Sequence, residues 1–324
     1  RDWLKVGANI SYSDNSKNGI TTGMGANRGG VVLAVINLPT SVPVWNEENN
    51  YYNRDFYGMN LVNPVEAMEN GKNNKAQETR LIASGNATIT FLPELSLKSS
   101  FTLDRRNYLK TTFTPPVHIE GIDEWGNASD NRNTIIVFDN VLTYQKVFDK
   151  HNVEGMAGTS WTASNYKNSW INGSHFRNSD IITLNVANKI AWNNTGTGAS
   201  EWGIMSYFGR LSYNYDGKYM VTANVRRDGS SKLHPDHRWG TFPSISAAWR
   251  ISSEKFMSGL DWLDDMKIRV SWGQTGNQSG VGDYAFLQKY NVTRQEWFKE
   301  GNENAVPTIT QANLRTSDLT WETT

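Results

Sequence analysis

The chain has 324 residues, and its 32 Lys and Arg balance its 32 Asp and Glu, so the formal net charge is zero. Without net positive charge or a basic run, binding of nucleic acid is excluded, and the absence of Cys excludes disulfides and thiolate chemistry. An aromatic content of 12% excludes a disordered chain. The longest apolar run, Val31–Ile36, is far shorter than the roughly 18 residues of a transmembrane helix.

Alternation of apolar and polar residues with period two dominates the sequence and predicts antiparallel β-strands. The clearest case is a hairpin over 203–229, whose Asp216-Gly217 turn is favoured because Gly accepts a positive φ. No strong amphipathic helix is expected, and 254–264 has room for one short helical turn. In chain order we expect strands over 3–13, 80–91, 95–103, 134–146, 152–163, 203–215, 219–229, 245–251 and 266–272, with the start of another at 319–324.

The links between these strands alternate between short and long. Short links are expected at 93–94, 147–151, 216–218 and 253–264, and long ones over 14–78, 107–133, 164–202, 230–241 and 276–316. Short turns at one end and long loops at the other are typical of transmembrane β-barrels. Alternation alone also fits a soluble sandwich, whose apolar face is a core, but the loop asymmetry favours the barrel. Tyr213, Tyr215 and Tyr219 then lie where an interfacial aromatic girdle is expected.

Several segments, in order, carry a family resemblance. Ser206–Tyr219 (SYFGRLSYNYDGKY) resembles a barrel hairpin of SusC/RagA-type TonB-dependent outer-membrane receptors. The segments that follow in the order of that family are Val225–Ser231, Arg238–Ser244, Ala248–Ser252, Lys267–Gln278 and Leu319–Thr324. The resemblance implies an all-β, antiparallel transmembrane barrel segment with about nine to ten strands of an about 22-stranded barrel.

The resemblance also implies that residues 1–324 are the middle of a barrel domain. The signal peptide, the plug domain and the C-terminal strands of the family are then absent from the chain. The implied function is TonB-dependent import of a large nutrient across the outer membrane of a Gram-negative bacterium. The expected cargo is an oligosaccharide, with an oligopeptide as the alternative. The expected partners are a SusD-like surface lipoprotein acting as a lid, the TonB complex reached through the plug, and outer-membrane lipid.

Aromatic residues in the expected long loops are the candidates for substrate contact. Flat rings pack on the C–H faces of sugars, and nearby Asn, Asp and Arg can bind hydroxyl groups. Packing of the loops, or contact with the lipoprotein lid, is the alternative role of the same rings. The candidates are Trp45, Tyr51, Tyr52, Trp125 and Trp170.

Polar residues of the 203–229 hairpin are the candidates for the barrel lumen. Alternation predicts that Arg210, Asn224, Arg226 and Asp228 face the lumen, with Arg226 and Asp228 in an ion-pair network or against the plug. The same phase turns Leu211, Tyr213, Val221 and Val225 toward lipid.

No covalent chemistry is expected. The sequence has no Gly-x-Ser-x-Gly elbow, and its Gly-rich runs do not lie between a strand and a helix, so neither a nucleophile nor a nucleotide site is predicted. His234 and His237 flank Pro235 and are interpreted as polar loop residues, so no metal or other cofactor is expected. A secreted β-rich carbohydrate-binding or adhesin domain is the alternative from a different class.

Overall fold

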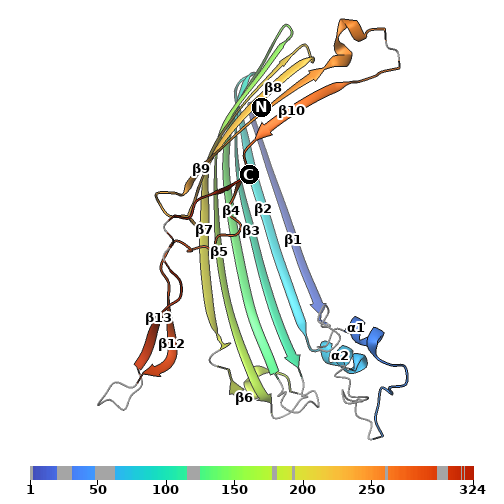
Figure 1. Cartoon of the computed structure of the whole chain (residues 1–324), viewed down its shortest axis with the longest axis vertical. Helices are drawn as coiled ribbons and strands as arrows, with labels where there is room; N and C mark the ends of the chain where they lie inside the picture. Colours follow the sequence, from blue (N-terminus) through green and yellow to red (C-terminus); the bar gives the residue numbers. More distant parts are fainter. Residues whose placement is uncertain are drawn as a thin grey trace.

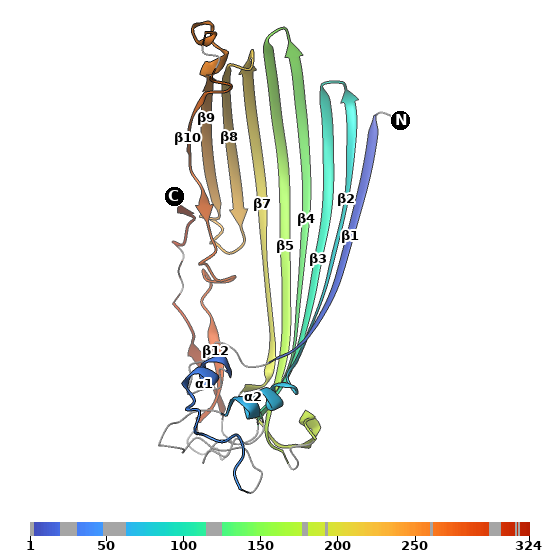
Figure 2. The ribbon, with the colours of Figure 1, turned by 90° about the vertical axis from the view of Figure 1, so that its right-hand side faces the viewer.

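The computed structural model describes residues 3–19, 31–47, 63–114, 125–176, 181–191, 194–259, 262–297, 306–314, 316 and 318–324. Ten strands form one antiparallel sheet in the order β1-β2-β3-β4-β5-β7-β8-β9-β10, with β6 paired to β5 off this path. Every step along the path joins strands that are neighbours in sequence, apart from the small β6. The sheet is long and curved, as Figures 1 and 2 show from two directions.

The strands of the sheet differ greatly in length. β2 to β5 and β7 are much longer than the strands at the C-terminal side of the sheet. The bounds are β1 Leu4–Asn18, β2 Lys75–Leu92, β3 Leu95–Thr114, β4 Trp125–Phe148, β5 His151–Phe176, β6 Ala187–Ile190, β7 Gly196–Tyr215, β8 Tyr219–Ser230, β9 Trp239–Arg250 and β10 Lys267–Gly273.

Smaller elements lie beside the main sheet. Two short helices, α1 (Val31–Asn37) and α2 (Pro64–Gly71), interrupt the first long link, near the end of the sheet where β1 stops and β2 begins. Two two-stranded sheets follow β10: β11 (Gly276–Asn277) with β14 (Glu322–Thr323), and β12 (Tyr290–Trp297) with β13 (Val306–Gln311). The predicted start of a further strand at 319–324 is therefore the very short β14. Short 3-10 turns cover Leu184–Val186, Ile251–Ser253 and Lys255–Met257.

No helix in the described part of the chain is both long enough and apolar enough to cross a membrane.

Three of the four predicted short links are confirmed as tight turns. Leu92 pairs with Leu95 across Pro93-Glu94, and Phe148 pairs with His151 across Asp149-Lys150. At the third turn, Asp216 and Gly217 both have positive φ, 54° and 68°, and the Lys218 amide donates to the Tyr215 carbonyl at 2.9 Å. These are the features of a type I′ turn, whose twist matches that of the flanking strands. Short turns at 93–94, 149–150 and 216–218 thus lie at one end of the sheet.

Cross-strand register separates the sheet into two faces, which we call the apolar face and the polar face. Leu211 opposes Ala223 and Tyr213 opposes Val221, whereas Arg210 opposes Asn224. Following the register across the sheet extends the apolar face through Leu4–Tyr12, Leu81–Ile89, Leu95–Leu103, Ile136–Tyr144 and Val153–Ala163, counting alternate residues. Each stretch matches the about 9–11 residues of a strand that crosses a bilayer. We call these stretches together the apolar band.

The apolar face is exposed in the isolated chain. Val6 is 73% exposed, Val270 68% and Leu211 57%, values opposite to those expected for a core. A soluble sandwich would cover this face with a second sheet. In the described residues no second sheet does so, because the main sheet is a single layer. An exposed apolar band of this size needs another apolar medium against it.

Aromatic residues mark the short-turn end of the apolar band. Tyr144, Tyr213, Tyr219 and Trp249 lie on the apolar face near this end. Tyr215 and Tyr219 stack beside the turn with ring centroids 6.3 Å apart. The hydroxyl of Tyr219 and the indole N–H of Trp249 both donate to Glu254 Oε1, at 2.5 and 3.1 Å. These rings present an apolar body and a polar end, as residues of an interfacial girdle do.

The strands continue well beyond the predicted bounds, and here the sequence-based boundaries were wrong. Residues 107–114, 125–133, 164–176 and 196–202, expected in long loops, are strand, and we call these segments the strand extension. In this extension both faces carry polar side chains, so the period-two pattern that identifies a strand is lost although the backbone ladder continues. The loops at this end shorten accordingly, but they stay longer than the turns at the other end.

The sheet is open among the described residues, because β1 and β10 are its two ends and do not pair with each other. In a small closed barrel, β1 and β10 would have paired with each other. An open, curved, single-layer sheet with one apolar face is the geometry expected for a piece of the wall of a wider barrel. Its buried apolar residues are few and local, among them Phe113, which packs edge-on against Phe176 at 5.0 Å, and Leu233.

Neighbouring residues on β8 allow a test of which face meets lipid. Ala223→Arg would place a charge in the apolar band, whereas Asn224→Arg would place it on the polar face. We expect Ala223→Arg to lower the free energy of unfolding of the full-length receptor in lipid vesicles by about 2–4 kcal/mol. Asn224→Arg, the matched control, should cost far less. Equal losses for the two variants would contradict the assignment of faces.

Candidate functional site on the polar face

The four residues predicted to face the lumen lie together on the polar face of β7 and β8. Arg210 opposes Asn224, and Asp228 opposes Ser206. Arg226 Nε donates to both carboxylate oxygens of Asp228, at 2.8 and 2.9 Å, and its Nη2 donates to Ser206 Oγ at 2.9 Å. The predicted ion pair is therefore present. Asn224 in turn donates to Ser244 Oγ of β9 at 3.1 Å.

A second group of charges lies on the polar face of β2 and β3. Arg80 opposes Arg106 across the strands, and each is held by a carboxylate. Arg80 donates to Asp104 in a bidentate pair at 2.9 and 2.6 Å, and Arg106 Nη2 lies 2.6 Å from Glu78 Oε2. Fork geometry of this kind is strong for an exposed pair. The alternating signs make this part of the face polar without giving it a net charge.

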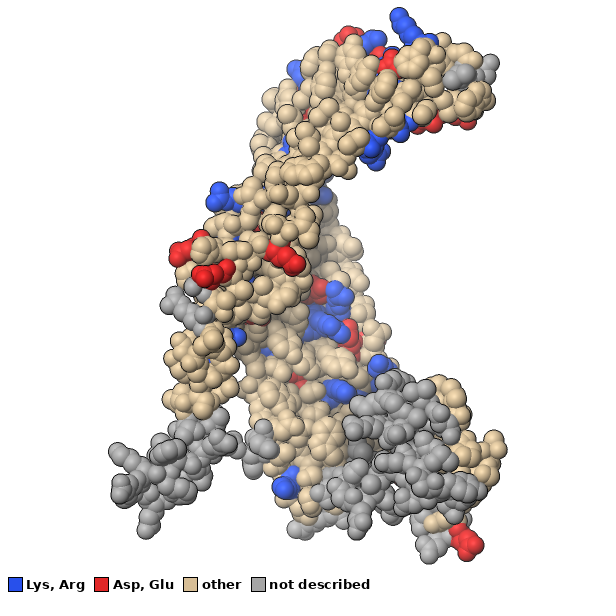
Figure 3. All heavy atoms as spheres, viewed as in Figure 1, with Lys and Arg blue, Asp and Glu red and all other residues tan. Residues whose placement is uncertain are grey.

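This mixture of signs holds across the surface that Figure 3 displays, where Lys and Arg are interspersed with Asp and Glu over the middle of the sheet. A large field of one sign is not visible there. The surface is accordingly suited to hydrogen bonding with a neutral or zwitterionic molecule, and less to attraction of a polyanion.

Two of the predicted substrate-contacting aromatics lie on the polar face. Trp170 of β5 opposes Ser129 of β4, and Trp125 of β4 opposes Ser174 of β5, so both rings belong to the strand extension. Trp125 is 40% exposed. They were predicted in loops, and the structure places them on strands instead. A rigid strand holds a ring in one orientation more firmly than a loop does.

Sequence reasoning missed other aromatics of the same face. Tyr108 of β3, Tyr166 of β5 and Trp202 of β7 follow the phase of the polar face. The hydroxyl of Tyr166 donates to Asn131 Oδ1 at 2.8 Å, and the Arg106 guanidinium lies 5.9 Å from the centre of the Tyr108 ring. Extending the period-two phase beyond the apolar band would have found them. Amides that share this surface are Asn127, Asn131, Asn133, Asn168 and Asn172.

Of the remaining predicted aromatics, the structure describes Trp45 alone, and it does not lie on this surface. Trp45 lies between α1 and α2, close to Asn63, whose side chain donates to the Val44 carbonyl at 2.9 Å and caps α2. Trp45 is 49% exposed. Tyr51 and Tyr52 lie outside the described residues.

A polar contact joins two loops at the extended end of the sheet, and we call it the loop clasp. Lys232 Nζ lies 3.0 Å from Asp283 Oδ1, donates to the Val281 carbonyl at 3.2 Å and sits 5.6 Å from the centre of the Trp202 ring. Ser200 of β7 also donates to Asp283. Burial raises the pKa of Asp283, but the hydrogen bonds from Ser200 and Lys232 outweigh it and hold the pKa below its ordinary value.

The histidine pair behaves as a loop feature. His234 Nδ1 lies 3.4 Å from Asp236, and the His234 ring packs edge-on against Phe286 at 5.9 Å. In the part of the chain that the structure describes, no group of three or more His, Asp or Glu is placed to hold a metal ion.

Comparison with known proteins shows the family to which this chain belongs. Residues 4–324 match the family model described as TonB dependent receptor-like, beta-barrel. The chain is thus part of an outer-membrane β-barrel of the Gram-negative type. It belongs to the TonB-dependent receptor β-barrel family and, within it, is of the SusC/RagA type. This is a family of transporters and not of enzymes, and it excludes the secreted adhesin alternative.

The chain is similar to TonB-dependent receptors of two bacteria, among others. The chain is 33% identical over 276 residues to the TonB-dependent receptor P39 of Formosa agariphila, covering 84% of this chain and 26% of the relative. It is 26% identical to the TonB-dependent receptor SusC of Bacteroides thetaiotaomicron, covering 100% of this chain and 33% of SusC. The chain therefore spans about a quarter to a third of the length of these relatives.

Solved structures show the same fold. A structure of the RagAB peptide importer in the "closed-closed" state superposes with a TM-score of 0.77 at 21% identity, covering 100% of this chain and 35% of that chain. The "open-open" state gives 0.78 at 21% identity. The same strand order thus serves a known importer.

The loop clasp predicts a dependence on pH. Because the pKa of Asp283 is lowered in the folded state, its stabilising contribution is complete above the ordinary pKa and is lost as pH falls through the lowered value. In the full-length receptor, the hydrogen-exchange protection of residues 278–289, taken relative to the intrinsic exchange rate at each pH, should therefore fall in acid. Asp283→Asn should show the lower protection already at neutral pH, with little further change in acid. Protection in the unmodified receptor that does not change with acid would contradict the clasp.

Proposed function

We propose that this chain is part of the barrel domain of a longer receptor that imports a large nutrient across the outer membrane, driven by TonB. The support is the combination of family membership with an apolar band of membrane-crossing length on one face only. In this proposal the plug that contacts TonB and the remaining strands lie in other parts of the protein. The polar face then lines the lumen, and the chain acts as one wall of a gated conduit without covalent chemistry.

The proposed cargo is an oligosaccharide. The observation that carries this choice is the pairing of aromatic rings with amides on the polar face of the strand extension, around Trp125, Trp170 and Tyr166. Rings offer flat apolar surfaces to the C–H faces of a sugar, while Asn side chains both donate to and accept from hydroxyl groups. The arginines of the same face are already paired with carboxylates of the chain, so they do not need a charged cargo as a partner.

An oligopeptide is the second candidate. It is favoured by the likeness of the fold to the RagAB peptide importer. Asn-rich strands can also bind the amide groups of an extended peptide. The proposed lid is a SusD-like surface lipoprotein, as the SusC/RagA resemblance implies, and it would meet the end of the sheet that carries the long loops, α1 and α2.

Trp125 and Trp170 provide the test. In the full-length receptor with its lipoprotein, calorimetric titration with pools of oligosaccharides and of oligopeptides would identify the cargo class. Trp125→Ala and Trp170→Ala should each weaken binding of the oligosaccharide by up to about tenfold through loss of the ring face. Trp161→Ala is the matched control, because Trp161 lies on the apolar face of β5.

Three outcomes would contradict parts of the proposal. Binding of peptides alone would replace the oligosaccharide by the second candidate. Unchanged affinity in both tryptophan variants, with normal folding, would remove these rings from the cargo site. Cargo binding by the chain when it is soluble and monomeric without detergent or lipid would contradict the barrel itself.

A further inference from the structure

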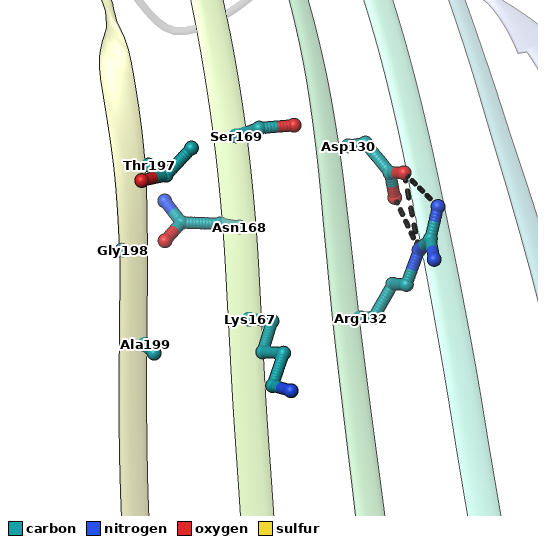
Figure 4. A pocket seen from close by; sticks show the side chains of 8 residues that line it. All are labelled: Asp130, Arg132, Lys167, Asn168, Ser169, Thr197, Gly198 and Ala199. Atoms are coloured by element: carbon teal, nitrogen blue, oxygen red, sulfur yellow. Dashed lines mark hydrogen bonds and ion pairs between the residues drawn. The ribbon is translucent and has the colours of Figure 1, made fainter.

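β7 continues beyond the end of its neighbour β8 on the long-loop side of the sheet. Pairing of β7 with β8 stops at Ile204, whereas pairing of β7 with β5 continues to Gly196. Among the described residues, one edge of the segment 196–201 therefore has no partner strand, and we call it the free edge of β7. Figure 4 shows part of this segment, around Gly198, with β5 on one side of it and no strand on the other.

The odd-numbered residues of β7 direct their backbone groups toward this edge. Gly203 shows the direction, because its carbonyl accepts from the Ser231 amide at 2.9 Å and its amide donates to Ser231 Oγ at 2.8 Å. Farther from the membrane, the groups that Thr197 and Ala199 direct to the same side have no hydrogen-bond partner in the part of the chain that the structure describes. A row of unpaired N–H and C=O groups is a template for another strand.

The hairpin of β12 and β13 also has an open edge. It pairs with no other strand of the described residues, and a two-stranded hairpin on its own is at best marginally stable in water. The Ala312 amide donates to the Lys289 carbonyl at 2.8 Å, so Lys289 and, by alternation, Asn291 are the residues bonded to β13. The backbone groups of Tyr290 and Val292 therefore point away from β13, to the open side of β12.

The path of the chain brings these two edges close to each other. Just before β12, the hydroxyl of Tyr284 accepts from the Glu201 amide at 3.1 Å, and the loop clasp holds Asp283 to Ser200. Figures 1 and 2 both place the hairpin beyond the ends of β8 and β9, on the side of β7 away from β5. β12 runs away from the short-turn end of the sheet and β7 runs toward it, which is the direction needed for antiparallel pairing.

We infer that β12 adds to the free edge of β7 as a further antiparallel strand, so that residues 278–297 act as a strap that extends the sheet on the long-loop side of β8 and β9. Tyr290 then pairs with Ala199, and Val292 pairs with Thr197. Both pairs fit one register, because a step of two residues along β12 is matched by a step of two along β7. The outward-facing N–H and C=O groups of these four residues satisfy one another.

The added strand extends the polar face next to the candidate cargo site. In the same register Asn291 opposes Gly198, and directly opposed residues share a face. The ring of Trp170 lies over the neighbouring Gly196, where an added Cβ would be 3.3 Å from it. The strap thus brings an amide side chain to the edge of the surface that carries Trp170. This consequence for cargo rests on the proposed function, whereas the pairing of the strands does not.

Engineered cysteines in the purified full-length receptor test the pairing. Ala199→Cys with Tyr290→Cys should form a disulfide on mild oxidation, because directly opposed Cα atoms of such a pair lie about 5.5 Å apart. The matched control is Lys167→Cys with Tyr290→Cys. Lys167 opposes Ala199 on β5 and shares its face, but it is one strand farther away, about 10 Å from Tyr290, which a disulfide cannot bridge. We expect about tenfold more cross-linked receptor for the test pair, measured by mass spectrometry of the joined peptides.

Hydrogen exchange of the unmodified receptor is a second measurement, which needs no cysteine. The Val292 amide should be protected as strongly as the Asn291 amide, because one donates to β7 and the other to β13. Ala199→Pro removes an amide from the free edge and none from the ladder with β5, so it should lower the protection of Val292 about tenfold and leave Asn291 unchanged.

Three results would each overturn the added strand: absence of the test disulfide in a folded receptor, equal cross-linking of the two cysteine pairs, or exchange of Val292 at its intrinsic rate. Heat-modifiable migration on gels checks folding, and if the cysteine variants do not fold, the exchange of Val292 in the unmodified receptor decides. Neither measurement uses cargo, so failure of the strap and failure of the proposed function are separate results.

Discussion

The whole structure depends on register between neighbouring strands. Because side chains alternate with a period of two residues, a slip of one residue in any pair would exchange the two faces of that strand. Pairs such as Leu211 with Ala223 keep the apolar residues together along the sheet. Short turns at one end, including the type I′ turn at Asp216-Gly217, hold this register. The apolar band, the polar face and every site on them follow from it.

The same constraint divides the sheet into two zones along its length. Inside the apolar band one face needs an apolar medium, so the sequence there alternates. In the strand extension both faces carry polar side chains, so both can form polar contacts. The polar face carries Trp125, Trp170 and their amides, whereas the apolar face carries Arg105, Arg132 and Lys167. Opposite sides of the same strands therefore present different sets of side chains.

Prediction from sequence succeeded where alternation and turn residues agreed. The hairpin 203–229 and the turn at 93–94 were predicted closely, because apolar periodicity and turn chemistry are local. It was wrong for 164–176, where strand continues without alternation, and it missed α2, whose Asn63 cap and Pro64 are a local signal in a polar context. The aromatics Tyr108 and Trp202 were missed for the same reason, since no apolar pattern marks their strands.

The sequence by itself determined the class of protein, the hairpins within the apolar band, and which residues of each hairpin share a face. These properties depend on neighbours along the chain. Only the tertiary structure decided that Arg80 meets Asp104, that Lys232 meets Asp283, and that Arg132 opposes Lys167. Such contacts depend on the relative shift of whole strands and on the paths of the loops, which local periodicity does not encode.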